Sequence, residues 1–214
     1  RSMSKPITYV LAVTDMSGSM IGLVEDVRGG FNTYLKDLKL GAEEKGLKFR
    51  LSLTLFDTEF TSLCTGAKLK DVPELTTENY YARGATALLD PVGKTVVEYE
   101  KKVKLRKKDK VILYIQTDGQ ENSSLEFSWD NIREMLEKRK ETGQWAIMYV
   151  GQGIQSWAQG KLFGPGTQVI AGAATKSGTQ SSYTGRTMST IAYAAGASPD
   201  EAGDILSAAV KEEK

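Results

Sequence analysis

The distribution of hydrophobic residues along the chain predicts a series of β-strands. Phe49–Phe56 alternates apolar and polar residues, and Glu59–Cys64 follows it closely enough to turn back as an antiparallel edge hairpin. Thr167–Ala171 is a candidate for the last strand. Continuous apolar or β-branched runs, which are typical of strands buried on both faces, occur at Ile7–Thr14, Lys110–Thr117 and Gln144–Val150.

Apolar residues at helical spacing predict helices between these strands. Met20–Leu40 carries one apolar stripe, which begins at Ile21, and Ala87–Leu105 carries another. Ser128–Thr142 opens at a residue type that caps helices. We therefore expect each of these three segments to lead from one strand to the next as a helix.

The C-terminal part of the chain has a less regular pattern. We predict a helix over Ser181–Ala195, with small residues and Met188 facing the core. The stretch Gly164–Gly185 is rich in Gly, Ser and Thr and is expected to form ordered loops. Ser198 is followed by a proline and two acidic residues, which predicts a final helix running to about Val210.

Strands that alternate with helices indicate an α/β fold with a doubly wound, mostly parallel, Rossmann-like sheet and one antiparallel edge strand. A chain of 214 residues can bury one substantial core. We assign residues 5–197 to one domain and residues 198–214 to a C-terminal helix that packs on the domain or faces a partner. Ligands of such sheets bind beyond the carboxyl ends of the strands, so polar residues after a strand are candidates for function.

Five polar residues stand at such places. Three of them directly follow the first strand, one opens a helix in a small-residue turn, and one follows the strand Lys110–Thr117. Carboxylate and hydroxyl oxygens suit a hard cation such as Mg²⁺ or Mn²⁺. Taken singly, each residue also fits an ordinary helix cap or strand-ending turn. The five residues are Asp15, Ser17, Ser19, Thr86 and Asp118.

The motif order is D-x-S-x-S, then G-x-T, then T-D-G after a hydrophobic strand, and it resembles the metal-ion-dependent adhesion site of von Willebrand factor A domains. The resemblance runs from Ile7 to about Ala195 and looks like the small intracellular bacterial and phage branch. It implies one bound divalent cation, Mg²⁺ or Mn²⁺ rather than Ca²⁺, which takes an Asp or Glu side chain from a protein partner. The implied metal ligands are Asp15, Ser17, Ser19, Thr86 and Asp118.

The amino-acid composition argues against several classes of function. The absence of histidine removes the commonest general base and the usual zinc ligand, so we expect no catalytic residues and no enzyme. A net charge of +1 argues against a nucleic-acid partner, and we interpret the basic run Lys101–Lys110 as a solvated helix end. One cysteine, Cys64, and no apolar signal or spanning segment favour a cytoplasmic protein without membrane contact.

Three functions are compatible with these features. The first is a metal-dependent protein-binding module, in which Gln120, Glu121 and Asn122 form a rim that contacts the partner. The second is a Mg²⁺-dependent phosphohydrolase with the first-strand aspartate as nucleophile, although such enzymes need a second acid where Ser17 stands. The third is a structural or assembly subunit of a phage or bacterial complex.

Overall fold

A computed structural model describes residues 4–153 and 155–211 and is built around a six-stranded sheet. The strand order is β3-β2-β1-β4-β5-β6, and every described pairing is parallel except that of β2 with β3. The predicted mostly parallel sheet with one antiparallel edge strand is therefore confirmed. The strands are β1 (Thr8–Asp15), β2 (Phe49–Phe56), β3 (Phe60–Lys68), β4 (Lys110–Thr117), β5 (Trp145–Gln152) and β6 (Gln168–Gly172).

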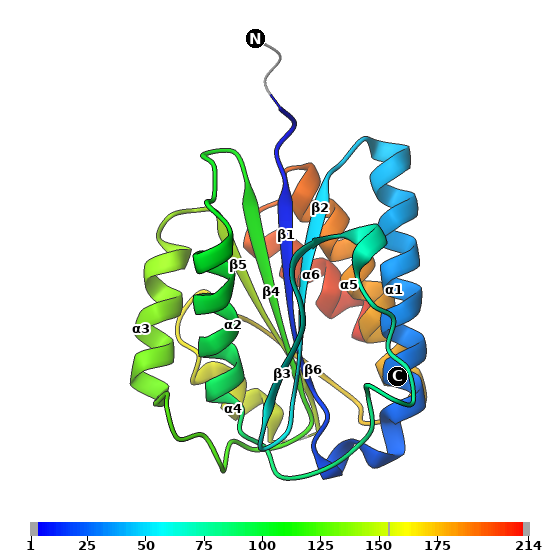
Figure 1. Cartoon of the computed structure of the whole chain (residues 1–214), viewed down its shortest axis with the longest axis vertical. Coiled ribbons are helices and arrows are strands. Elements are labelled where there is room, and N and C mark those ends of the chain that lie inside the picture. Colours follow the sequence, from blue (N-terminus) through cyan, green and yellow to red (C-terminus); the bar gives the residue numbers. More distant parts are fainter. Residues whose placement is uncertain (1–3, 154, 212–214) are drawn as a thin grey trace.

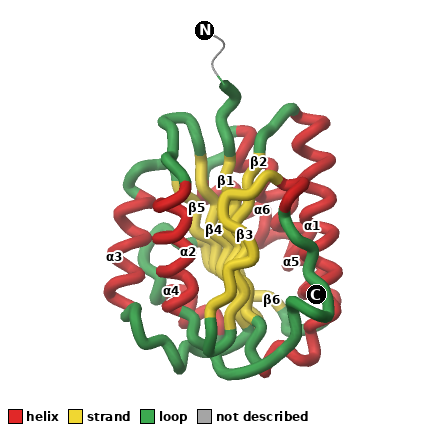
Figure 2. Tube along the Cα trace, in the orientation of Figure 1, coloured by secondary structure: helices red, strands yellow, loops and turns green. Residues whose placement is uncertain are grey.

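Helices cover both faces of this sheet (Figures 1 and 2). One face is covered by α1 (Val24–Lys45), α5 (Lys176–Ala195) and α6 (Pro199–Lys211). The other face is covered by α2 (Leu89–Lys102), α3 (Trp129–Lys140) and α4 (Ser156–Lys161). Two 3-10 turns, η1 (Gly18–Leu23) and η2 (Leu69–Asp71), follow β1 and β3. Among the helices of the described residues, none is long and apolar enough to cross a membrane.

Two hydrophobic cores lie on opposite faces of the sheet, because side chains alternate along each strand. In β1, Val10 and Ala12 face the core under α1 and α5, whereas Leu11 and Val13 face the core under α2 and α3. Each fully buried aliphatic side chain stabilises the fold by roughly 1.5–3 kcal/mol. Burial on both faces explains why the central strands are continuous apolar runs in the sequence.

The first helix begins differently from the prediction. The chain leaves β1 through η1, and α1 starts only at Val24. Ile21 was placed in the apolar stripe, but its side chain is 75% exposed. A 3-10 turn has three residues per turn, so its side chains do not continue the stripe of the α-helix that follows.

The prediction for α5 was partly wrong. Met188 does not face the core, because 53% of it is exposed. The stretch Gly164–Gly185, predicted as loops, contains β6 and the first turns of α5. The inner face of α5 is polar and includes Arg186, whose guanidinium lies over the rings of Tyr114 and Tyr183, 5.0 and 4.6 Å from their centroids. The first turns of α5 bury small and polar residues, so no apolar stripe predicts that the helix begins at Lys176.

The last helix, α6, forms where the sequence predicts it and packs against α5 and β6. Ala202 and Leu206 are fully buried in this contact. Residues 212–214 of the predicted C-terminal segment lie outside the described residues. The short helix α4 was not predicted, because six residues are too few to show a helical period.

Two adjacent glycines of α1 should respond in opposite ways to alanine. A Cβ at Gly30 would lie 2.3 Å from Cδ2 of the buried Tyr183 ring, so Gly30→Ala should lower the free energy of unfolding by about 1–3 kcal/mol. A Cβ at Gly29 meets no atom within 4 Å, so Gly29→Ala should raise it by about 0.5–1 kcal/mol through helix propensity. Urea denaturation measures both values. Equal effects of the two substitutions would contradict the close packing of α1 on α5.

Candidate metal centre

Strand β1 brings the carboxylate of Asp15 to the carboxyl edge of the sheet in a fully buried position. One carboxylate oxygen accepts the backbone N–H of Ser17 at 2.6 Å, and the other accepts the Thr117 hydroxyl at 2.5 Å. The hydroxyl of buried Tyr80 donates to the carbonyl oxygen of Asp15 at 2.6 Å. The orientation of the carboxylate is therefore fixed by its own loop and by β4.

Two serines and a second aspartate form a connected polar cluster beside Asp15. The hydroxyl oxygens of Ser17 and Ser19 are 3.1 Å apart, and the Ser19 hydroxyl donates to the carboxylate of Asp118 at 2.6 Å. Strands β1 and β4 are parallel neighbours, so the residues that follow them leave the same edge of the sheet. The strand order thus brings two aspartates that are distant in sequence to one place.

Thr86 reaches this cluster because its loop packs against both neighbouring loops. Its side chain is buried, and its Oγ1 lies 2.7 Å from the place that a Cβ on Gly119 would occupy. The N–H of Gly18 donates to the carbonyl oxygen of Gly84 at 3.1 Å. Gly84 has a φ of +69°, and a Cβ there would lie 2.9 Å from Oδ2 of Asp57, so only glycine fits. All five residues that the sequence predicts as metal ligands therefore lie together.

The three residues predicted to form a partner-binding rim have different surroundings. Glu121 accepts backbone N–H groups at the start of α2, including that of Leu89 at 2.9 Å, and so satisfies donors that the helix itself leaves free. The side-chain oxygen of Asn122 accepts the N–H of Thr86 at 3.2 Å. Gln120 and Asn122 are exposed. Contact of these three residues with a partner stays a prediction, and the structure gives Glu121 and Asn122 a positioning role as well.

The electrostatics of the cluster favour a cation. Among the described residues, no salt bridge includes Asp15 or Asp118. The pKa of Asp15 is raised to about 6, chiefly by burial; hydrogen bonds from Ser17 and Thr117 oppose the rise, and the neighbouring Asp118 adds to it. A buried carboxylate without a counter-ion destabilises the folded chain, because its charge has lost its hydration.

Comparison with known proteins identifies the fold. No protein-family model and no curated protein sequence matches the chain. Proximal thread matrix protein 1 from the mussel byssus is 15% identical, with 89% of this chain and 46% of that chain aligned at a TM-score of 0.62. The pilus adhesin SpaC from Lactobacillus rhamnosus GG is 13% identical, with 91% of this chain and 31% of that chain aligned at a TM-score of 0.65. A von Willebrand factor type A structure from Catenulispora acidiphila is 11% identical, with 88% of this chain and 43% of that chain aligned at a TM-score of 0.57.

The chain has the von Willebrand factor A fold. The resemblance inferred from the three motifs is thus confirmed at the level of the fold. The chain spans less than half the length of each of these three matched chains. In the von Willebrand factor A fold of this chain, the candidate cluster lies where the loops after β1 and β4 meet the loop that leads into α2.

The donor set fits a small hard divalent cation. It offers two carboxylates and three hydroxyls, which are all oxygen donors of the kind that Mg²⁺ and Mn²⁺ prefer. Within residues 4–153 and 155–211, no group of three or more His, Cys, Asp or Glu side chains is placed to hold a metal ion. Hydroxyl groups therefore have to complete any site here, and Ser17, Ser19 and Thr86 supply them.

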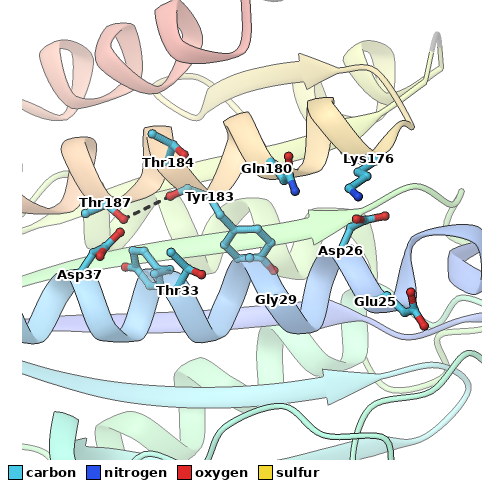
Figure 3. Close-up of a pocket in the computed structure, with 12 residues that line it drawn as sticks. Glu25, Asp26, Gly29, Thr33, Asp37, Lys176, Gln180, Tyr183, Thr184 and Thr187 are labelled. Atoms are coloured by element: carbon cyan, nitrogen blue, oxygen red, sulfur yellow. Dashed lines mark hydrogen bonds between the residues drawn. The ribbon is translucent and has the colours of Figure 1, made fainter.

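A separate hollow of about 560 Å³ lies between α1 and α5 (Figure 3). It is lined by Glu25, Asp26 and Asp37 from α1 and by Lys176 from α5, among others. None of the five predicted metal ligands lines it. The candidate metal centre is instead an open site formed by loops, in which Ser19 is exposed.

Sequence reasoning missed two residues that hold the cluster in place. Thr117 belongs to the T-D-G motif, but the motif does not reveal that its hydroxyl donates to Asp15. Tyr80 lies in a segment without regular structure, and its hydrogen bond to the Asp15 carbonyl depends on the path of that segment. Neither contact leaves a periodic signal in the sequence.

Asp15→Asn should stabilise the cation-free chain at neutral pH. The pKa of Asp15 is about 6 when folded, above the ordinary value near 4 expected when unfolded, so folding binds the proton more tightly. The contribution of this group to stability is therefore fully present below about pH 4 and is lost as the pH rises to about 6. In the presence of chelator, the substitution should raise the free energy of unfolding by about 1–3 kcal/mol at pH 8 and change it little at pH 4.

Urea denaturation at the two pH values, with EDTA present, measures this difference. Asp71→Asn serves as the control, because it removes one negative charge from an exposed position. Equal changes for Asp15→Asn at pH 4 and pH 8 would show that the buried charge is not the source of the effect.

Proposed function

We propose that the chain is a divalent-cation-dependent protein-binding module whose site takes one acidic side chain of a partner. One observation carries the proposal: Asp15 and Asp118 lie beside the hydroxyls of Ser17 and Ser19 at the sheet edge, with the Thr86 hydroxyl packed against Gly119. In the described residues, no basic side chain forms a salt bridge with either carboxylate. The cation would be Mg²⁺ or Mn²⁺. The residues that would hold it, directly or through water, are Asp15, Ser17, Ser19, Thr86 and Asp118.

When bound, the cation supplies a Lewis-acidic position for an oxygen atom from outside the chain. The residues of the chain decide which oxygen fits. Three of the five donors are neutral hydroxyls, and both oxygens of Asp15 already accept hydrogen bonds from Ser17 and Thr117. The positive charge is thus less neutralised than it would be by a set of carboxylates alone. An anionic Asp or Glu oxygen from a partner is therefore the preferred outside ligand.

Two structurally similar proteins support this assignment through what is known of them. Proximal thread matrix protein 1 of the mussel byssus has a structure with a zinc-occupied metal-ion-dependent adhesion site. SpaC is a pilus adhesin. The likeness extends to the fold, and the residues at the sheet edge of this chain carry the rest of the proposal.

The geometry gives less support to the phosphohydrolase alternative. Its nucleophile would be Asp15, whose side chain is 0% exposed and has both oxygens engaged in hydrogen bonds. Ser17, which is not an acid, stands at the position of the second acid, and its hydroxyl lies 3.1 Å from that of Ser19. A protein-binding role needs neither a free nucleophile nor a proton donor.

Titration calorimetry should detect one Mn²⁺ or Mg²⁺ per chain. Thr86→Val keeps the shape of the side chain and removes one oxygen donor, and Asp118→Asn removes one charge. Each should weaken cation binding by roughly 10-fold or more. Ser177→Ala, at an exposed serine in the first turn of α5, is the control and should change nothing.

Millimolar acetate should strengthen cation binding by the wild type, because acetate can occupy the place of the partner carboxylate. The proposal is contradicted if the wild type binds neither cation with or without acetate. It is also contradicted if Thr86→Val and Asp118→Asn bind as well as the wild type.

A further inference from the structure

Three exposed hydrophobic side chains lie on the loops that form the candidate metal centre. Seven large hydrophobic side chains of the described residues are exposed, and three of them lie on the three loops that form the cluster. They are Ile21, Tyr81 and Leu125, which are 75%, 42% and 93% exposed. Apolar side chains that are exposed on the loops of one site are available for contact with a partner.

The loops of Ile21 and Tyr81 are in direct contact. Ile21 lies in η1, two residues beyond Ser19. The N–H of Gly18, at the start of η1, donates to the carbonyl oxygen of Gly84 at 3.1 Å, three residues beyond Tyr81. This hydrogen bond holds the two loops together at the edge of the candidate metal centre.

Leu125 lies on the third loop, which begins with Asp118. The N–H of Asn122 donates to the carbonyl oxygen of Thr86 at 3.0 Å, and the N–H of Leu125 donates to the Asp90 carboxylate at 2.8 Å. The backbone of this loop is therefore anchored, while the Leu125 side chain extends into solvent. All three loops lie at the lower end of the sheet in Figure 1.

The loops of the candidate metal centre carry more acidic than basic residues. Residues 15–28, 57–59, 74–90 and 118–130 together contain twelve Asp or Glu and two Lys or Arg. Lys94 and Arg133, just outside these ranges, pair with Glu126 and Asp130, and an excess of acidic residues remains. This excess of negative charge remains after one divalent cation has bound. The opposite edge of the sheet includes Lys101–Lys110, which contains seven Lys or Arg and one Asp. A partner with many acidic residues would be repelled from the metal end.

We propose that Ile21, Tyr81 and Leu125 form an apolar collar that selects one kind of partner segment. The segment has a single Asp or Glu between apolar side chains, with basic residues further out. This inference rests on the proposed function. Apolar contact with the collar excludes water from the bond between the partner carboxylate and the cation, and attraction between opposite charges is stronger in a drier environment. The basic residues of the partner then meet the acidic loops.

Four capped heptapeptides test the collar, with the full chain, Mn²⁺ and ¹⁵N-resolved NMR titration or calorimetry. The first peptide has a central glutamate between two leucines and a lysine at each end. The others replace glutamate with glutamine, both leucines with serine, or both lysines with glutamate. We expect the first peptide to bind and chelator to abolish its binding. The glutamine peptide should not bind, and the serine and glutamate-ended peptides should bind at least about fivefold more weakly.

Variants of the collar give a second readout that folding defects do not imitate. Leu125→Ser and Ile21→Ser should each weaken binding of the first peptide by about three- to tenfold and leave Mn²⁺ binding unchanged. Leu40→Ser and Met188→Ser are matched controls, because these residues are 49% and 53% exposed and lie in the second halves of α1 and α5. Both controls should bind Mn²⁺ and the peptide like the wild type.

The outcomes separate the collar from the proposed function. Equal binding of the leucine and serine peptides overturns the collar and leaves the metal-dependent module standing. The collar is also overturned, and the metal-dependent module is not, if the control variants lose as much affinity for the peptide as the collar variants. A glutamate-ended peptide that binds most tightly has the same consequence. Peptide binding that survives chelator, or a chain that does not bind Mn²⁺ at all, overturns both.

Discussion

Asp15 carries a negative charge at the end of the central strand, fully buried and without a basic partner among the described residues. The pKa of Asp15 is raised to about 6, mainly because burial removes the hydration of its charged form. The surrounding structure supplies hydrogen bonds to both carboxylate oxygens but no counter-charge. A divalent cation would supply the missing counter-charge, and the proposed metal-dependent function rests on this imbalance. In this proposal the neighbouring hydroxyls would orient the cation without neutralising its charge.

The hydrophobic cores that stabilise the fold lie on the faces of the sheet, whereas the candidate metal centre lies on the loops at its carboxyl edge. Two apolar cores on opposite faces hold the parallel strands β1 and β4 next to each other, so the loops that follow them meet without having to be stable by themselves. Contacts between the loops then fix the polar groups: Gly84 permits a close approach to Asp57, and Glu121 satisfies the first N–H groups of α2. The side chains of the proposed apolar collar are exposed beside these contacts, and that of Tyr81 also contacts Arg83.

The sequence alone predicted most of the fold and five candidate ligands that the structure brings together, and their role as metal ligands stays a prediction. Buried strands such as Lys110–Thr117 were located to the residue, because burial on both faces leaves an uninterrupted apolar run. The five cluster residues were found because each lies at a junction between elements. Features that depend on three-dimensional surroundings were not predicted. The polar inner face of α5, with Arg186 between two tyrosine rings, has no apolar stripe. The exposure of Ile21 results from a 3-10 turn that has no sequence signal, and Tyr80 reaches Asp15 through an irregular loop.

Anomalous diffraction from crystals grown with Mn²⁺, recorded at the manganese absorption edge, tests the central claim most directly. We expect one anomalous peak at metal–oxygen bonding distance from the hydroxyls of Ser17 and Ser19 and in the first or second coordination sphere of Asp15 and Asp118. A peak in the hollow between α1 and α5, beside Asp26 and Asp37, would place the cation elsewhere. That result, or the absence of any peak at the sheet edge, would contradict the account.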